Sequence, residues 1–310
     1  MTTKNTLAAA LFALATLAAP ASALAAPALD HVTLAPEAAQ TLRASVAAAR
    51  ASDPRAFADV AALVARTPEL DRKARSGKAP VSLALAAMGG RAVMPLAELL
   101  AFDPPAGLTR EQVRAARLPA LEALGMLRDA RVAPVLFGWL EQADLDATRV
   151  AAEAVARLDS DEAATRLVSA LSRASGDRAL AVLAGMGSCH RAPVAKALAD
   201  RLAQADEATA RVVVKSLRRA ASPWAWQTLA RRDDESAVRD LASEALVGAF
   251  VRFDGETRDA AEKALAVVDD GRVSTFVKSA RARATAPKQA DLDALAARLA
   301  ARPRDAKLAP

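Results

Sequence analysis

Tyrosine is absent from this 310-residue chain, aromatic residues make up only 3% of it, and it contains two histidines and one cysteine. A single cysteine has no partner within the chain, so disulfides do not hold this fold together. The composition, 53% hydrophobic and 25% charged, is sufficient to bury a large core and is not that of a disordered chain. Alanine and leucine are frequent while runs of β-branched residues are few, which predicts an all-α protein.

The start of the chain differs from the rest. Lys4 precedes an uncharged apolar run from Leu7 to Ala19, and the small-residue sequence ASALA follows shortly after. This order is typical of a secretory signal peptide, here residues 1–25, with cleavage after Ala23 or Ala25. The apolar run is too short to span a bilayer comfortably. We therefore expect an extracytoplasmic protein, periplasmic or secreted, with no transmembrane span in the mature chain.

A ten-residue pattern, RAVMPLAELL at 91–100, recurs along the chain. An arginine or a neighbouring polar residue comes first, a proline follows about one turn later, and leucines occur at helical spacing; similar stretches begin at Arg131 and His190. A second pattern, clearest in RLPALEALG from Arg117, has an arginine followed by small residues, a leucine and a glycine. The two patterns alternate, so each pair of helices predicts one structural repeat.

Both patterns give the same period. The leucines at comparable positions are separated by 31, 31 and 27 residues; they are Leu140, Leu171, Leu202 and Leu229. The arginines of the second pattern are separated by 32, 29, 33 and 28 residues; they are Arg117, Arg149, Arg178, Arg211 and Arg239. A fixed period of roughly 20 to 50 residues indicates a solenoid, because one helix pair cannot bury its apolar face until neighbours stack on it.

The repeated stretches resemble the HEAT repeat family, in particular the short bacterial form that also occurs in phycobilisome-lyase HEAT-like proteins. RAVMPLAELL matches the first helix of that repeat, and RLPALEALG at 117–125 and VRDLASEAL at 238–246 match the second. The resemblance covers residues 80–250. It implies a right-handed α-α superhelix, a HEAT-like solenoid of antiparallel helix pairs whose surface binds other molecules, with no universal catalytic residue. Armadillo repeats are the nearest alternative, but they usually need a third helix and a longer period.

Less regular segments frame the repeats. We predict a linker at 26–35, an N-terminal helical cap at 36–80, the HEAT-like repeats at 81–250, an irregular C-terminal helical cap at 251–302 and a tail at 303–310. The C-terminal segment is assigned as a cap because the arginine period fails there and because its charged end suits an element that must face water.

Local signals predict several helix ends. Asp53 before Pro54 caps one helix, and a capping box formed by Thr109 and Gln112 starts another. Pro119 lies inside that second helix and predicts a kink or a restart, and the glycine at position 125 predicts its end.

No constellation of catalytic residues is evident in the sequence. Cys189 and His190 are adjacent, but tetrahedral zinc needs more ligands at suitable spacing than this pair provides. A lone cysteine can be a nucleophile, a ligand or an intermolecular bridge; in an alanine-rich context a small buried residue is the favoured interpretation. We therefore predict no catalytic residue, no cofactor and no metal site.

The three tryptophans are assigned by their neighbours. Trp139 shares an apolar stripe with Val135 and Leu136, which predicts a place in the core. Trp224 and Trp226 are two residues apart on a helix and therefore cannot face the same way. We predict that Trp226 is the exposed one and that it contributes to a binding surface.

Two helices of the second pattern carry basic residues at i, i+4 and i+7, which places them on one stripe in each helix. The stripes are Arg110, Arg114 and Arg117, and Arg211, Lys215 and Arg218. In HEAT-like arrays the second helices line the concave side, so by resemblance these stripes would face inward and attract acidic protein segments or polyanions. Alternatively, Arg117 and Arg211 pair with acids of the adjoining loops, and the others form a solvated surface.

These observations favour a non-catalytic exported scaffold that binds a protein partner through its solenoid surface. Two alternatives are a binder of an anionic polymer or surface that uses the basic stripes, and a lyase-like enzyme or enzyme accessory. HEAT-like DNA glycosylases also use aromatic residues on a concave surface, but an exported protein does not meet chromosomal DNA, so no nucleic acid partner is expected. Catalysis predicts a pocket of polar residues with shifted pKa values, whereas a scaffold predicts a long groove.

Overall fold

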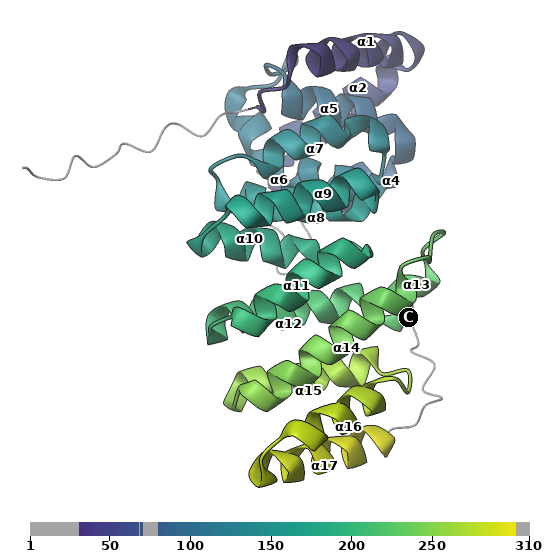
Figure 1. Ribbon diagram of the computed structural model, residues 1–310. Helices are drawn as coiled ribbons and strands as arrows, with labels where there is room; N and C mark the ends of the chain where they lie inside the picture. The colour runs from purple at the N-terminus through teal and green to yellow at the C-terminus, as the bar shows by residue number, and fades with distance from the viewer. Residues whose placement is uncertain (1–30, 68, 71–79, 302–310) are drawn as a thin grey trace, which may run out of the picture.

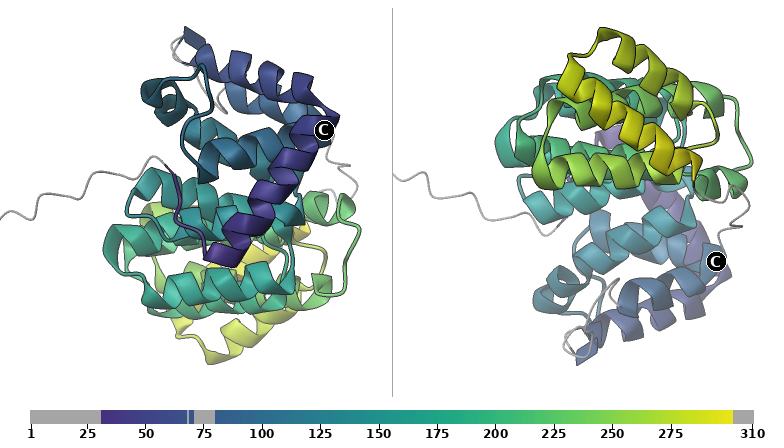
Figure 2. Two further views of the ribbon diagram at one scale, coloured as in Figure 1. Left: turned by 90° about the horizontal axis from the view of Figure 1, so that it is seen from above. Right: turned by 90° about the horizontal axis from the view of Figure 1, so that it is seen from below.

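The computed structural model describes residues 31–67, 69–70 and 80–301. Within these ranges the chain is helical and contains no strand, which confirms the prediction of an all-α fold (Figure 1). The helices stack one pair after another into a solenoid-like body. Figure 2 shows that the N-terminal helices are displaced sideways from the rest of the stack, so its axis is bent. The proposed signal peptide, the tail at 303–310 and residues 71–79 of the predicted N-terminal cap lie outside the described residues.

The helices at the start of the described chain form the N-terminal end of the stack. They are α1 (Pro36–Ser52), α2 (Pro54–Ala65) and α4 (Pro80–Ala87), followed by the short 3-10 helix η1 (Gly89–Ala92). The Asp53 carboxylate accepts a hydrogen bond of 3.1 Å from the Ala56 backbone N–H, as the sequence predicts for a helix cap. Gly89 adopts a φ of +66° directly after α4, a conformation that favours glycine and ends the helix there.

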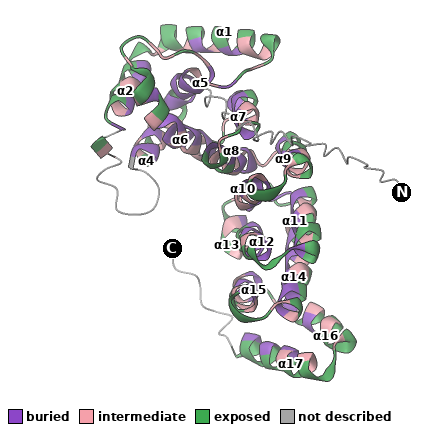
Figure 3. Ribbon diagram, turned by 90° about the vertical axis from the view of Figure 1, so that its left-hand side faces the viewer, coloured by how far each residue is buried: buried purple, intermediate pink, exposed green. Residues whose placement is uncertain are grey.

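The regular part of the stack has two layers (Figure 3). The first helices of the pairs form one layer: α5 (Val93–Ala101), α7 (Ala133–Leu140), α9 (Asp161–Arg173) and α11 (Ala192–Gln204). The second helices form the other layer: α6 (Arg110–Leu127), α8 (Leu145–Leu158), α10 (Gly176–Met186) and α12 (Glu207–Ala220). Each helix contacts both its pair partner and the next helix of its own layer, so the apolar faces form a continuous core.

This alternation changes at α13 (Pro223–Gln227), which is too short to occupy a place in either layer. After it come α14 (Glu235–Arg252), α15 (Gly255–Val268), α16 (Val273–Arg283) and α17 (Ala286–Ala300). Helix α14 packs between α11 and α16 in the layer of first helices, and α15 packs on α12 (Figure 3). The stretch at 238–246, predicted as a second helix, therefore lies in the first layer, and the register changes earlier than residue 250.

Helix α6 confirms its predicted start and corrects its predicted end. The predicted capping box is present, since the Thr109 hydroxyl accepts from the Gln112 N–H and the Gln112 side chain accepts from the Thr109 N–H. The helix then continues through Pro119 to Leu127 without a restart, and it passes the glycine at position 125 as well. It ends at Arg128, which adopts the left-handed conformation with φ 54°.

Glycines allow the second helices to approach one another closely. A Cβ atom on Gly125 would lie 2.7 Å from the Cα of Ala154 in α8, and one on Gly185 would lie 2.5 Å from the Cβ of Ala152 in the same helix. At the end of α10, a Cβ atom on Gly187 would lie 2.7 Å from Ser216 in α12. Side chains at these positions would force the backbones apart, so Gly125 serves close packing rather than helix termination.

The segment at 31–35, predicted as part of a linker, packs on the body of the protein. Val32 is 2% exposed, and its N–H donates a hydrogen bond of 3.2 Å to the carbonyl of Leu100. Its side chain occupies the space that a Cβ atom on Gly138 would fill. Nearby, Trp139 is fully buried and its Nε1 donates to the same Leu100 carbonyl at 3.1 Å, which confirms its predicted place in the core.

Candidate functional site

The first predicted basic stripe, on α6, does not act as one surface. Arg110 and Arg114 are exposed, whereas Arg117 is 9% exposed. The guanidinium of Arg117 pairs with Asp144, which lies in the loop before α8, and it lies 5.4 Å from the ring of Trp139. This confirms the alternative in which Arg117 pairs with an acid of the adjoining loop, so its charge is already balanced inside the protein.

The second stripe, on α12, is more open. Arg211 forms an ion pair of 3.0 Å with Glu256 at the start of α15. Lys215 and Arg218 are exposed and form no ion pair with any residue in the described ranges. Helices α8 and α10 lie between α6 and α12, so the two stripes do not join into one basic track.

The prediction that Trp226 is exposed is wrong, because its neighbour Trp224 is. Trp226 is 1% exposed, donates from Nε1 to the Ala220 carbonyl at 2.9 Å, and meets the His190 ring edge to face at 5.2 Å. Trp224 is 56% exposed. The two residues do face different ways, but which one is buried depends on how α13 docks against α11, α12 and α14, which the local pattern does not specify.

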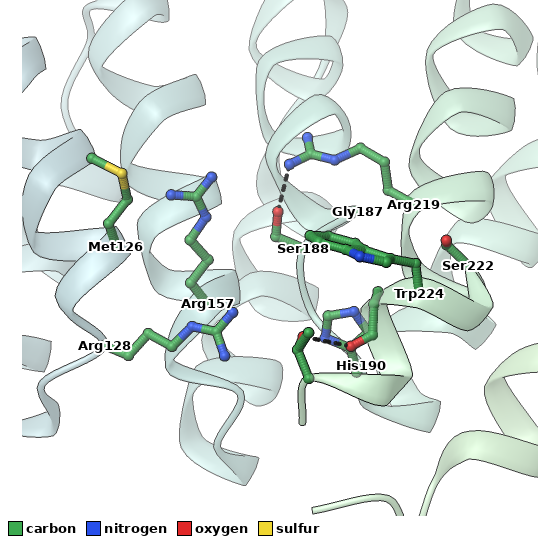
Figure 4. A pocket seen from close by; sticks show the side chains of 11 residues that line it. Met126, Arg128, Arg157, Gly187, Ser188, His190, Arg219, Ser222 and Trp224 are labelled. Atoms are coloured by element: carbon green, nitrogen blue, oxygen red, sulfur yellow. Dashed lines mark hydrogen bonds between the residues drawn. The ribbon is translucent and has the colours of Figure 1, made fainter. Parts of the chain in front are cut away.

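Trp224 borders a pocket of about 420 Å³ at the edge of the stack where the C-terminal ends of the second helices lie (Figure 4). We call it the arginine pocket, after Arg128, Arg157 and Arg219 in its lining. Arg128 and Arg157 lie on one side and Trp224 and His190 lie on the other, while Arg219 lies above Trp224 and reaches towards Ser188 (Figure 4). The pocket exists where α13 interrupts the regular packing.

The arginines of the pocket occupy equivalent places in successive repeats. Arg128 follows α6, Arg157 is near the end of α8, Ser188 follows α10 and Arg219 is near the end of α12. Their separations are 29, 31 and 31 residues, which match the repeat period. Cations are favoured near helix C-termini, where the partial charge of the helix is negative. The repeat thus brings residues that are far apart in sequence into one row.

Glu153 of α8 partly balances this row. Its Oε1 lies 2.5 Å from Nη2 of Arg157 and 2.9 Å from Nη2 of Arg219, and Arg219 also donates to the Ser188 hydroxyl at 2.7 Å. The side chain of Arg128 forms no hydrogen bond or ion pair with any residue in the described part of the chain. Three arginines and one glutamate leave the cluster with a formal charge of +2, which favours an anionic ligand.

His190 lines the pocket, and the buried Cys189 precedes it in the chain. The backbone N–H of His190 donates a hydrogen bond of 2.7 Å to Oδ1 of Asp159. Burial lowers the pKa of His190 below its ordinary value; Asp159 opposes this shift, and the charges of Arg128 and Arg219 add to it. Burial raises the pKa of the Cys189 thiol to about 12, so the thiol stays protonated and its prediction as a buried residue is confirmed.

The arginine pocket is not visible from the spacing of basic residues along single helices. Arg157 and Arg219 lie on two different helices, α8 and α12, and Arg128 lies just after a third, α6. Their spacing of one or two repeats was the available signal, since equivalent positions of a solenoid come together on one edge. Among the described residues no group of three or more His, Cys, Asp or Glu side chains is placed to hold a metal ion.

No protein-family model matches this chain, and no curated protein matches it. In the described ranges no single helix is long and apolar enough to cross a membrane; the segments Val81–Ala87 and Gly89–Ala101 reach that length and apolarity only together, across a bend of 114°.

Proposed function

We propose that this protein is an extracytoplasmic HEAT-type scaffold, without catalysis of its own, that binds another protein through the edge of its second-helix layer. The observation that carries the proposal is the arginine pocket, where a large aromatic side chain is exposed beside a net positive charge. Tryptophan and arginine are enriched among the residues that dominate binding energy at protein interfaces. A stack of packed helices holds these groups in fixed positions, which reduces the entropy lost on binding.

The chemistry of the pocket supports recognition. Its arginines and the Ser188 hydroxyl supply hydrogen-bond donors, and the guanidinium groups suit carboxylates. The group with a shifted pKa in its lining is His190, and the cause of that shift is burial against Trp226 and its surroundings. The Cys189 thiol, with its raised pKa, is poorly suited to attack a substrate.

The test is capture of partners from the envelope fraction of the source cells by the purified mature protein, followed by mass spectrometry. The bound proteins are compared with those captured by an Arg128→Gly, Trp224→Ala double variant. We expect specific proteins to be retained by the wild type and depleted with the variant. Failure of the wild type to retain any protein over a bare-resin control would refute the scaffold proposal.

Export is tested separately. If residues 1–25 are a signal peptide, material recovered from outside the cytoplasm begins at Leu24 or Ala26. Sequencing of the N-terminus measures this directly. An intact Met1 or Thr2 on protein confined to the cytoplasm would contradict the proposed location and would restore nucleic acid as a possible partner.

A second candidate function is supported by the open part of the α12 stripe. Lys215 and Arg218 are exposed and form no ion pair within the described ranges, so they can attract an anionic polymer or surface. Binding of this kind weakens as salt shortens the screening length. A Lys215→Glu, Arg218→Glu variant should then lose binding to the polymer, and binding that ignores both the substitutions and the salt would exclude this function.

A further inference from the structure

We propose that the arginine pocket binds an acidic peptide segment in which an aromatic or large aliphatic side chain stands among carboxylates. This inference rests on the proposed function, a protein-binding scaffold, and specifies the chemistry of the segment that the scaffold recognises. It depends on three features of the pocket: guanidinium groups already arranged around a carboxylate, an unbalanced arginine, and an exposed indole beside them.

Glu153 is an internal example of the proposed ligand. Its carboxylate lies between Arg157 and Arg219, at 2.5 Å and 2.9 Å from their Nη2 atoms, and the Arg157 side chain is 13% exposed. These two guanidinium groups are therefore positioned to receive a carboxylate. A guanidinium has five N–H donors, so each keeps donors for a second acceptor.

Arg128 supplies the charge that the protein leaves unbalanced. It is exposed, it points into the pocket from the side opposite Trp224 (Figure 4), and it forms no ion pair with a described residue. Its left-handed backbone, φ 54° and ψ 32°, fixes it at the end of α6, in a conformation that asparagine or glycine would adopt more easily than arginine. A segment that contains two carboxylates would balance the formal charge of +2.

Trp224 supplies the apolar part of the site. It is 56% exposed, although an indole is one of the side chains with most to gain from burial. Met126 and Ala225 border the same pocket, so an incoming apolar side chain would contact carbon atoms on more than one element. An inorganic anion would leave this surface in water, which favours a ligand that has both carboxylates and an apolar group.

The surrounding charges argue against a dense polyanion. Glu153 lies within the row of arginines, and Asp159 lies close by, near the His190 ring. The equivalent position of the third repeat is Ser188, so the row of cations is interrupted after Arg157. A chain of closely spaced negative charges would meet these carboxylates, whereas a short segment with two or three of them would not.

The test uses a blocked pentapeptide with one acidic residue on each side of a central phenylalanine and a serine at each end, labelled with fluorescein for anisotropy measurements. A second peptide replaces phenylalanine with serine and keeps the charge, and sodium tripolyphosphate is the inorganic competitor. We expect the phenylalanine peptide to bind about tenfold more tightly than the serine peptide, because the aromatic contact is lost in the latter. Tripolyphosphate should compete poorly at equal concentration.

Tryptophan fluorescence reports where the peptide binds. The chain has three tryptophans, and Trp139 and Trp226 are 0% and 1% exposed, so Trp224 is the one that acrylamide can quench. Saturating unlabelled peptide should protect this fluorescence from quenching. Quenching that is unchanged by bound peptide would overturn the proposal, since the ligand would then sit elsewhere.

Substitutions distinguish the pocket from the rest of the surface. Arg128→Gly removes the unbalanced charge without backbone strain, and it should weaken the peptide about tenfold. Trp224→Ala should weaken the phenylalanine peptide and leave the serine peptide nearly unchanged. Arg201→Ala is the matched control, because Arg201 is an exposed arginine of α11 that belongs neither to the pocket lining nor to the basic stripes. Circular dichroism should show equal helicity in all three variants.

The outcomes separate this inference from the function on which it rests. The inference is overturned if Arg201→Ala weakens the peptide as much as Arg128→Gly does, or if the serine peptide and tripolyphosphate bind as tightly as the phenylalanine peptide. If partners are captured equally by the wild type and the pocket variants, the scaffold function stands and the pocket is not its site. If the wild type captures no partner, the scaffold function fails, whatever the peptide does.

Discussion

Replacing glycine by alanine should have opposite effects in the two layers. Gly185 in α10 and Gly248 in α14 both lie inside helices, where alanine is favoured over glycine by about 1 kcal/mol. At Gly248 nothing lies within 4 Å of an added Cβ, so Gly248→Ala should stabilise the protein by about 0.5–1 kcal/mol.

At Gly185 the added methyl group would collide with the backbone of α8. The added Cβ would lie 2.5 Å from the Cβ of Ala152 and 2.6 Å from the backbone nitrogen of Glu153, so α10 and α8 must separate. Overpacking of this kind costs about 1–3 kcal/mol, which offsets or exceeds the gain in helix propensity. The difference between the two variants should therefore be about 1–3 kcal/mol, with Gly185→Ala the less stable.

The assay is urea unfolding followed by circular dichroism at equal protein concentration, with the slope fitted for each variant. Gly125→Ala is an independent copy of the buried case, because its Cβ would lie 2.7 Å from the Cα of Ala154. If Gly185→Ala and Gly125→Ala stabilise the protein as much as Gly248→Ala, the second helices are not as closely packed as described.

Three further predictions concern the thiol, the histidine and the overall shape. The Cys189 thiol, with a pKa of about 12, should react with Ellman's reagent at pH 8 only after unfolding in urea; rapid reaction of the native protein would contradict its burial. The pKa of His190 is lowered in the folded state, so the unfolded chain binds the imidazole proton more strongly. The contribution of the buried neutral imidazole to stability is therefore fully present above about pH 6.5 and is lost as the pH falls towards the folded pKa. The unfolding free energy of the wild type should then approach or fall below that of His190→Gln between pH 7 and pH 5, and parallel curves would exclude this linkage. Small-angle scattering of the mature monomer should give a radius of gyration clearly above the value of about 19 Å for a compact protein of this length, and the compact value would contradict the stacked architecture.

Helix starts were predictable because their signals are local. Asp53 and the Thr109–Gln112 box act within one turn, and the structure places both as the sequence predicts. Cys189 and His190, whose spacing does not suffice for a metal site, are both buried. The continuous α6 shows that packing can override a local signal, since Pro119 and Gly125 are both buried inside it.

Tertiary arrangement decided what the sequence did not. Whether Trp224 or Trp226 is buried depends on how the five-residue helix α13 docks. Because α13 is too short to occupy a place in the first layer, α14 packs there against α11. The basic residues of both stripes do lie on helices, α6 and α12, as their spacing predicts. However, Arg117 pairs with Asp144, and two helices separate the stripes. The row of Arg128, Arg157 and Arg219 becomes visible only when equivalent repeat positions are compared.

The glycine contacts have a geometric consequence for the whole stack. Gly125, Gly185 and Gly187 all make their close approaches between second helices, whereas Gly248 of the first layer approaches nothing within 4 Å. When one of two joined layers has the shorter spacing, the pair must curve towards it, and Figure 3 shows the stack bent towards the second helices. The curvature of the stack therefore depends on the close packing that glycine allows at these three positions, and larger residues there should straighten the stack.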